Sequence, residues 1–208
     1  MADSPPERAN AGRQADEAAD ADAALRERAV ETRLIHAGRV IDLRIDTVEL
    51  ADGERRQREI VEHPGAVAIV ALDGNDVLLV RQYRHAAGRA LLEIPAGTRD
   101  RRPDGALEPP AETASRELAE ETGHGAARWR HLGTFWTAPG FATEAMDLYL
   151  ASELTPVPAV GPAGDERLTL VRMPWRRAVE LCESGAIADA KSIVGLFWLA
   201  RLVDRGEL

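Results

Sequence analysis

Two apolar runs separated by a tight turn constrain the fold of this chain most strongly. Residues 65–72 and 77–83 are strongly apolar, and the residues between them are Asp73, Gly74, Asn75 and Asp76. Asp, Asn and Gly supply the short connections that join two antiparallel strands. The sequence therefore predicts a β-hairpin with buried strands in the middle of the chain.

Shorter β-type runs lie on both sides of this hairpin, and helical composition comes late. Pro110 suits the first turn of a helix over residues 111–122, and Gly123 suits its C-terminal cap. Asp189 suits the N-cap of the last helix. The predicted strands are residues 40–50, 58–63, 91–94, 129–136, 146–151 and 168–173, the helices 111–122, 175–184 and 190–204, and a loop 155–165. A strand-rich core with one central helix and helices at the end indicates the α+β class.

Residues 1–30 differ from the rest in composition. They are rich in Ala, Asp and Glu and contain no aromatic residue. Such a segment buries too little apolar surface to offset the entropy of ordering it. We expect an acidic, mobile tail with room for a short helix over residues 18–30. It has no charged start followed by an apolar stretch, so it does not resemble a secretory signal.

Composition excludes two classes of function. The 208 residues carry 26 Lys and Arg against 35 Asp and Glu, a net charge of −9, without a basic stripe for nucleic acid. The longest apolar stretches, residues 66–72 and 193–200, fall well short of the roughly 20 residues that cross a bilayer. Cys182 has no partner for a disulfide, which is typical of a reducing compartment. We expect a cytoplasmic protein that binds neither nucleic acid nor membrane.

Carboxylates crowd the predicted central helix. Glu117 and Glu121 stand four residues apart on one face, and Glu120 lies next to that line. Like charges at this spacing repel unless a cation compensates. An oxygen-only cluster suits Mg²⁺ or Mn²⁺. An acidic helix face by itself is usually solvated surface, so this pattern alone leaves both interpretations open.

The helix lies in a longer motif. Glu108 is followed after seven residues by Arg-Glu-Leu-Ala-Glu-Glu-Thr-Gly over residues 116–123. This string resembles the Nudix box, a loop-helix-loop that binds divalent metal. Two positions depart from it: Arg102 stands where the box opens with Gly, and His124 where it ends with an aliphatic residue. Gly97 takes the opening role if the loop before Glu108 carries an insertion, which surface loops tolerate.

The flanking segments resemble the ADP-ribose pyrophosphatase group of Nudix hydrolases. They are residues 81–85, 92–97 and 137–144, including Pro139 about 16 residues after Gly123. The resemblance covers residues 40–202 and implies the Nudix fold, a mixed β-sheet between helices. It also implies hydrolysis of the diphosphate of ADP-ribose or a related nucleoside diphosphate sugar, giving AMP and ribose 5-phosphate. The N-terminal β region, residues 31–64, matches a part through which dimeric members associate, so a homodimer with a Nudix domain at residues 65–208 is expected.

The resemblance also implies roles at the catalytic centre. Glu117, Glu120, Glu121 and the backbone carbonyl of Ala96 would hold Mg²⁺, or Mn²⁺ in its place, and Arg116 would orient a box carboxylate. Glu144 would activate the attacking water. Glu120 or Glu121 as the base is the competing assignment, and a solvated Glu144 is the structural alternative.

Three further residues are candidates for substrate binding. Arg81 and Arg84 could bind the diphosphate, although ordinary charges at a strand end explain either one as well. Three positions apart, they face opposite sides of an ideal strand, so both line one pocket only if the strand ends between them. Glu93 could contact substrate or support groups that do.

Two other functions stay open. One is a Nudix diphosphatase for another nucleoside diphosphate linked to X, such as a GDP-sugar or a dinucleotide. The other is a non-catalytic sensor that binds ADP-ribose and regulates transcription. Sensors of that kind carry an added DNA-reading module, whereas the helices after Met173 show no basic recognition face.

Overall fold

The computed structural model describes residues 23–158 and 167–208, which form two compact units divided between Glu62 and His63. In the first unit, β1 (Arg28–Ala37), β2 (Asp42–Glu49) and β3 (Arg55–Glu62) form an antiparallel three-stranded sheet in the order β1-β2-β3. The prediction of a helix reaching residue 30 is wrong at its end, because β1 already begins at Arg28. The rest of the predicted tail, residues 1–22, lies outside the described residues.

The second unit is built on the predicted hairpin. β4 (Ala66–Asp73) and β5 (Asp76–Arg84) pair antiparallel, which confirms the turn at residues 73–76. The seven-stranded sheet has the order β10-β5-β4-β9-β8, with β6 on β5 and β7 on β4. β4 and β9 run parallel and the other pairs antiparallel. The remaining strands are β6 (Arg89–Glu93), β7 (Ala96–Thr98), β8 (His124–Trp136), β9 (Ala145–Pro156) and β10 (Leu168–Pro174).

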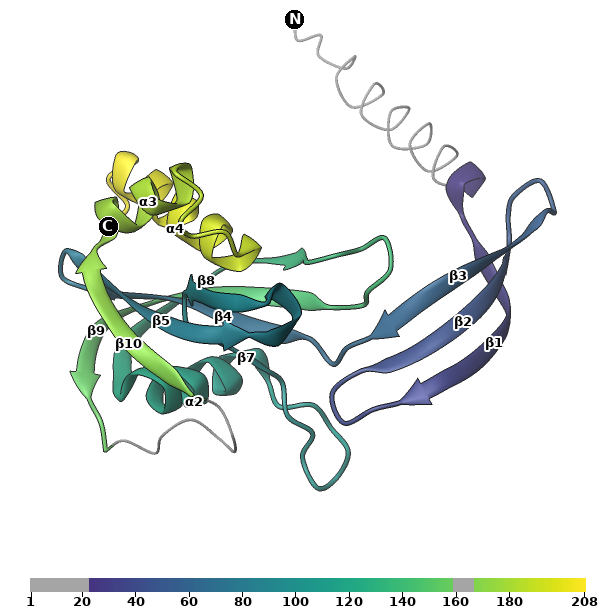
Figure 1. Cartoon of the computed structure of the whole chain (residues 1–208), viewed down its shortest axis with the longest axis horizontal. Helices are drawn as coiled ribbons and strands as arrows, with labels where there is room; N and C mark the ends of the chain where they lie inside the picture. Colours follow the sequence, from purple (N-terminus) through teal and green to yellow (C-terminus); the bar gives the residue numbers. More distant parts are fainter. Residues whose placement is uncertain (1–22, 159–166) are drawn as a thin grey trace, which may run out of the picture. The chain divides into compact units, whose positions relative to one another are not determined.

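Helices cover both faces of this sheet. α2 (Pro110–Thr122) lies on one face, and α3 (Trp175–Glu183) and α4 (Ala190–Asp204) lie on the other (Figure 1). The expected α+β class with a mixed sheet between helices is confirmed. None of the helices in the described part of the chain is long and apolar enough to pass through a membrane.

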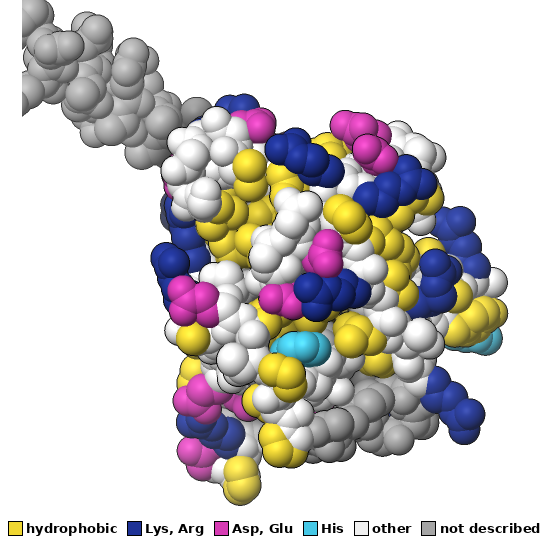
Figure 2. Space-filling view, turned by 90° about the vertical axis from the view of Figure 1, so that its left-hand side faces the viewer, with side chains coloured by type: hydrophobic (Ala, Val, Ile, Leu, Met, Phe, Trp, Pro, Cys, Tyr) yellow, Lys and Arg dark blue, Asp and Glu magenta, His cyan; other side chains and the backbone are white. Residues whose placement is uncertain are grey.

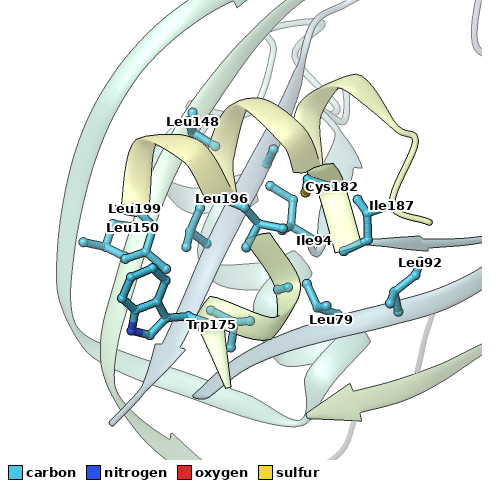
Figure 3. Close-up of a cluster of buried hydrophobic side chains, with 14 of the residues drawn as sticks. Leu79, Leu92, Ile94, Leu148, Leu150, Trp175, Cys182, Ile187, Leu196 and Leu199 are labelled. Carbon is cyan, nitrogen blue, oxygen red and sulfur yellow. The ribbon is translucent and has the colours of Figure 1, made fainter. Parts of the chain in front are cut away.

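The two faces bury separate apolar clusters because side chains alternate along each strand. Ala66, Ala68 and Val70 of β4 point into the larger cluster under α3 and α4, which Figure 3 shows. Val67 and Ile69 point to the other face, where Ala114 and Leu118 of α2 cover them. The centre of β4 is therefore buried on both sides, which explains its unbroken apolar sequence.

α2 and α4 have the predicted ends. α2 begins at Pro110 and ends before Gly123, whose φ of 68° is the left-handed conformation that glycine adopts without strain. Asp189 caps α4 by accepting a hydrogen bond from the backbone N–H of Ser192.

In the second unit, β7, β8 and β9 differ most from the sequence prediction, and in the first unit β1 was not predicted as a strand. β8 starts at His124 and β9 runs to Pro156, because these strands pair with each other over most of their length. The predicted loop is therefore wrong at residues 155–156, and its residues 159–165 lie outside the described part. The sequence predicts that the strand over residues 91–94 ends at Pro95, Ala96 and Gly97, whereas Ala96–Thr98 form the short strand β7 on β4.

Gly195 of α4 is packed so tightly that the usual preference for alanine over glycine in a helix is reversed. A Cβ on Gly195 of α4 would lie 2.9 Å from Ile94 Cδ1 and 2.9 Å from Val70 Cγ2. Alanine is the better helix former by about 1 kcal/mol, but overpacking a core typically costs 1–3 kcal/mol. Gly195→Ala is therefore expected to lower the free energy of unfolding by about 1 kcal/mol in urea titrations. A higher unfolding midpoint would contradict this close packing.

Charged side chains of both signs are mixed on the surface of the protein. Figure 2 shows one face of the molecule, on which Lys and Arg side chains lie among Asp and Glu side chains without forming a continuous patch of either sign. Ion pairs in the described part of the chain include Arg130 Nη2 with Glu207 Oε2 at 2.6 Å and Arg172 Nη1 with Asp73 Oδ2 at 2.7 Å.

Candidate active site on helix α2 and strand β7

Two carboxylates of α2 meet the backbone of β7. Glu121 Oε2 accepts a hydrogen bond of 3.0 Å from the backbone N–H of Ala96. Glu117 lies against Gly97 so closely that a Cβ at Gly97 would overlap its carboxyl group. Both carboxylates are buried. Since Ala96 and Gly97 pair with Ala68 and Val67 of β4, the central strand fixes the backbone on which these acids converge.

Arg116 binds the carboxylates around it. Its guanidinium donates to Glu117 Oε1 at 2.7 Å, to Glu120 Oε2 at 3.3 Å and to Glu108 Oε2 at 2.9 Å. Burial alone would lower the pKa of Arg116, but the bonds to Glu108 and Glu117 outweigh it and raise the pKa. The side chain is therefore a permanent cation that holds three box acids, and its contacts fit the predicted orienting role.

Glu108, in the loop before α2, accepts hydrogen bonds from Arg116 and Thr113 of the helix. Burial raises the pKa of Glu108, but hydrogen bonds from Arg116 and from the Thr113 hydroxyl, at 2.9 Å, outweigh burial and leave the pKa below its usual value. Glu108 is thus held ionised by its neighbours, and α2 and the loop before it are tied together through Arg116.

The inserted residues before Glu108 form a small excursion with a closed base. The backbone N–H of Glu108 donates to the carbonyl of Asp100 at 2.8 Å, and Arg101 bridges to Leu107 within the excursion. Arg99 Nε also donates to the Glu108 carbonyl at 2.8 Å. The two ends of the inserted loop, at residues 99–100 and at Glu108, therefore lie next to each other. The longer spacing from Gly97 to Glu108 thus leaves α2 and its carboxylates undisturbed.

Arg84 of β5 and Glu93 of β6 form a second group of charged side chains. Arg84 Nε and Nη2 each donate to Glu93 at 2.8 Å, a bidentate pair between β5 and β6. Burial raises the pKa of Glu93, but the bonds from Arg84 and Lys191 outweigh it and leave the pKa lowered. The pKa of Arg84 is raised mainly by its hydrogen bond to Glu93 and, to a smaller extent, by the negative charge of Glu121. The box charge therefore acts on Arg84, whose side chain is bonded to Glu93.

Arg81 is not brought into this group. It alternates with Val77 and Leu79, whose side chains belong to the cluster under α3 and α4, whereas Arg84 shares the opposite face with Leu78. Arg81 is exposed there. The predicted opposition of the two arginines along β5 agrees with this arrangement, and only Arg84 lies on the side of the box.

Glu144 lies on the loop between β8 and β9. Its Oε2 accepts a hydrogen bond of 2.6 Å from the Thr137 hydroxyl, and its Oε1 lies 3.7 Å from His63 Nδ1. His63 Nδ1 in turn accepts a hydrogen bond from the backbone N–H of Gly65 at 3.1 Å. The loop end that carries Glu144 is therefore tied to the start of β4, and the printed sequence gives no spacing that reveals His63 or Thr137 as its neighbours.

The donor chemistry around Ala96 and Gly97 fits a hard divalent cation. Every candidate ligand is an oxygen, and two of the carboxylates are buried where an unneutralised charge is costly. Within residues 23–158 and 167–208, however, no group of three or more His, Cys, Asp or Glu side chains already surrounds a position for a metal ion. Glu117 and Glu120 each accept a hydrogen bond from Arg116 through one oxygen in this structure. A carboxylate has two oxygens, so it can accept such a bond and also bind a cation.

The comparisons with known proteins agree with the motif. The NUDIX domain model matches residues 61–193. The chain is 37% identical over 177 residues to the ADP-ribose pyrophosphatase of Bacillus subtilis, covering 84% of this chain and 93% of that protein. It is 38% identical over 175 residues to a methanol dehydrogenase activator of Bacillus methanolicus, covering 83% and 92%.

The fold also matches a solved structure. A crystal structure of an ADP compounds hydrolase superposes with a TM-score of 0.75 and 26% identity, covering 88% of this chain and 98% of that chain. As a family, Nudix hydrolases depend on divalent metal ions. The chain belongs to the Nudix family of hydrolases, as its box motif predicted, and resembles the family's ADP-ribose pyrophosphatases.

Proposed function

We propose that this protein hydrolyses the diphosphate of ADP-ribose or a related nucleoside diphosphate sugar, giving AMP and ribose 5-phosphate from ADP-ribose. The observation that carries the proposal is the convergence of Glu117 and Glu121 on the backbone of Ala96 and Gly97. The pyrophosphatase relative and the structural match support the substrate class. Water attacks one phosphorus atom of the P–O–P bridge and the bridging P–O bond breaks. Each half of the substrate therefore keeps one phosphate.

The proposed cofactor is Mg²⁺, with Mn²⁺ as the alternative. Glu117, Glu120, Glu121 and the carbonyl of Ala96 would hold it. When bound, such a cation neutralises diphosphate charge and lowers the pKa of a coordinated water. Arg116 keeps its orienting role, since its pKa is raised and it already holds the box acids.

The protein's own groups supply binding and proton transfer. Arg84 uses Nε and Nη2 for Glu93, which leaves the Nη1 edge of a partly exposed guanidinium to bind phosphate oxygens. Glu93 supports Arg84 in this arrangement, and Arg81 would reach substrate only from the opposite face. Glu144 accepts the proton of the attacking water after its loop moves toward the box. Glu120 or Glu121 is the alternative base.

Replacing Glu144 with Gln tests the base. Loss of a general base typically costs 10²–10⁴-fold, so kcat for ADP-ribose is expected to fall by about 10²-fold or more. The Kd for Mn²⁺ should change less than threefold, because Glu144 is not a proposed ligand. Glu153→Gln, an exposed carboxylate of β9, is the matched control and should keep the wild-type rate. An unchanged kcat in Glu144→Gln would move the base to the box helix, to Glu120 or Glu121.

A substrate panel separates the candidate functions. We expect AMP from ADP-ribose with Mg²⁺ at a higher kcat/KM than products from GDP-sugars or dinucleotides. A preference for a GDP-sugar or a dinucleotide would favour the other Nudix diphosphatase activity.

The 38% identity to a methanol dehydrogenase activator favours a second candidate, a protein that acts through a partner enzyme. Tight binding of ADP-ribose without hydrolysis would support that role, or a sensor, over the enzyme.

We further propose a homodimer in the cytoplasm. Residues 31–64 would form the dimerisation region, residues 65–208 the Nudix domain and residues 1–30 a tail. Within the N-terminal unit, Leu34, Ile35, Val40 and Ile41 are exposed apolar side chains, which supports association through this sheet. Light scattering should give twice the chain mass of 22.6 kDa, and a monomeric mass would contradict the proposal.

A further inference from the structure

The segment that joins β6 to β7 is held at Ile94 by a side chain from the far end of the sequence. The backbone N–H of Ile94 donates to the Ser192 hydroxyl at 2.8 Å, across 98 positions of the chain. Ile94 and Ser192 are both fully buried. A buried N–H without a partner is costly, so this hydroxyl supplies an acceptor that the backbone of the loop lacks.

The same hydroxyl is fixed from its other side. Ser192 Oγ donates to Asp189, the N-cap of α4, while it accepts from Ile94. A hydroxyl has one proton to donate, so these two bonds set its orientation. Asp189 already satisfies the helix end through the backbone N–H of Ser192 at 3.0 Å. Capping α4 therefore does not require the side chain of Ser192 to reach the loop.

Lys191 makes a parallel connection to Arg84. Its ammonium group donates to Glu93 and, at 2.9 Å, to Asp189 Oδ1. Glu93 is 1% exposed and Lys191 8% exposed. Together with the bidentate Arg84–Glu93 pair, two cations and two anions form a neutral network from β5 to the first turn of α4. Lys191 thus shares the carboxylate that orients Arg84.

The three residues after Glu93 are each bound by a different element. Ile94 is bound by α4, the carbonyl of Pro95 accepts from the backbone N–H of Ile69 in β4 at 2.8 Å, and Ala96 donates to Glu121 of α2. Side chains also pack here, because Ile94 Cδ1 lies 2.9 Å from the position of a Cβ on Gly195 of α4. Figure 3 shows Ile94 in the cluster with Leu196 of that helix. The path of the chain through Ala96 is thus fixed from both faces of the sheet.

We propose that Ser192 and Lys191 in the first turn of α4 are positioning residues for the active site. Ser192 fixes the segment that presents the Ala96 carbonyl, and Lys191 fixes Glu93 and through it the guanidinium of Arg84. This inference rests on the proposed function of Ala96 as a ligand and Arg84 as a phosphate-binding residue. It predicts different kinetic effects for the two side chains, since they hold different groups.

The Ser192 connection is tested by Ser192→Ala with two matched variants. Ser192→Thr keeps the hydroxyl, and Leu199→Ala destabilises the same helix at a position of the buried cluster that Figure 3 shows beside Leu150 and apart from Ile94. Groups that orient metal ligands typically contribute 10–100-fold. In Ser192→Ala we expect a roughly tenfold higher Kd for Mn²⁺ by electron paramagnetic resonance and a roughly tenfold lower kcat. The Ala96 amide should also exchange faster with solvent.

The variants separate positioning from stability. Ser192→Thr should recover most of the Mn²⁺ affinity, and Leu199→Ala should lower the Tm but keep wild-type Mn²⁺ affinity and kcat below that temperature. The proposal is overturned if Ser192→Ala matches Leu199→Ala in Mn²⁺ affinity, kcat and Ala96 exchange. If the wild type does not hydrolyse ADP-ribose, the proposed function fails, while Mn²⁺ affinity and Ala96 exchange still decide the role of Ser192.

The Lys191 connection is tested by Lys191→Met against Lys191→Arg. Removing the ammonium leaves Glu93 to Arg84 alone, so KM for ADP-ribose should rise about tenfold while the Kd for Mn²⁺ changes less than threefold. Lys191→Arg keeps the charge and should recover a KM within threefold of wild type. If Lys191→Met does not fold, Lys191→Gln gives the same comparison. A wild-type KM in the uncharged variant would overturn the role of Lys191.

Discussion

Replacing Glu121 with Gln is expected to lower kcat for ADP-ribose by about three orders of magnitude. A metal ion contributes several kcal/mol to catalysis of this kind, and each 1.36 kcal/mol corresponds to a factor of ten. The fold should survive, because the Gln amide oxygen can still accept the hydrogen bond from the Ala96 N–H. Steady-state kinetics and circular dichroism on the same preparation measure both effects.

Glu112→Gln is the control for Glu121→Gln. Glu112 lies on the same helix but is exposed, and it pairs with Arg102 at the helix start. The change removes one charge from α2 in both variants, so a general effect of helix charge would appear in both. Wild-type turnover in Glu121→Gln, or an equal loss in Glu112→Gln, would contradict the assignment of Glu121.

Gly97→Ala is expected to have the second largest effect. The added Cβ would overlap the Glu117 carboxyl group, so either that side chain or the backbone of β7 must move. Glu117 is a proposed ligand, and we expect kcat/KM to fall by about 10²-fold. Overpacking should also lower the free energy of unfolding by roughly 1–3 kcal/mol. Kinetics with ADP-ribose and urea unfolding measure these changes.

Gly105→Ala controls for glycine replacement in the same loop region. Gly105 has a φ of 84°, so Ala strains the backbone there, but nothing lies within 4 Å of the added Cβ. A small loss of stability with wild-type kinetics is expected. If Gly97→Ala also keeps wild-type kinetics, Glu117 does not depend on the space that Gly97 leaves.

The elements with strong local signals were predicted closely. The unbroken apolar sequence of β4, the Asp-Gly-Asn-Asp turn and the Pro110 and Gly123 ends of α2 each depend on neighbouring residues, which a sequence shows directly. Glu117 and Glu121 share a helix face for the same reason. The opposite orientation of Arg81 and Arg84 also follows from strand periodicity alone.

The remaining features depend on contacts between distant residues. β1 lacks a burial alternation because nearly all its side chains are exposed, so its sequence resembles that of the polar segment before it. The short β7 exists because β4 offers it a partner. Ser192 and Lys191 reach the loop across 98 positions, and His63 and Thr143 meet across 80. Among these residues, only the N-cap signal of Asp189 could direct attention to the start of α4.

The central claim is that the α2 carboxylates and the backbone at Ala96 hold a divalent cation for hydrolysis of ADP-ribose. It is tested most directly by following AMP release from ADP-ribose by the wild-type protein with Mg²⁺, with excess EDTA, and after Mg²⁺ is restored. We predict equal amounts of AMP and ribose 5-phosphate, a loss of at least about 10²-fold in EDTA, and full recovery. Equal rates with Mg²⁺ and with EDTA, or no AMP under any condition, would contradict the account.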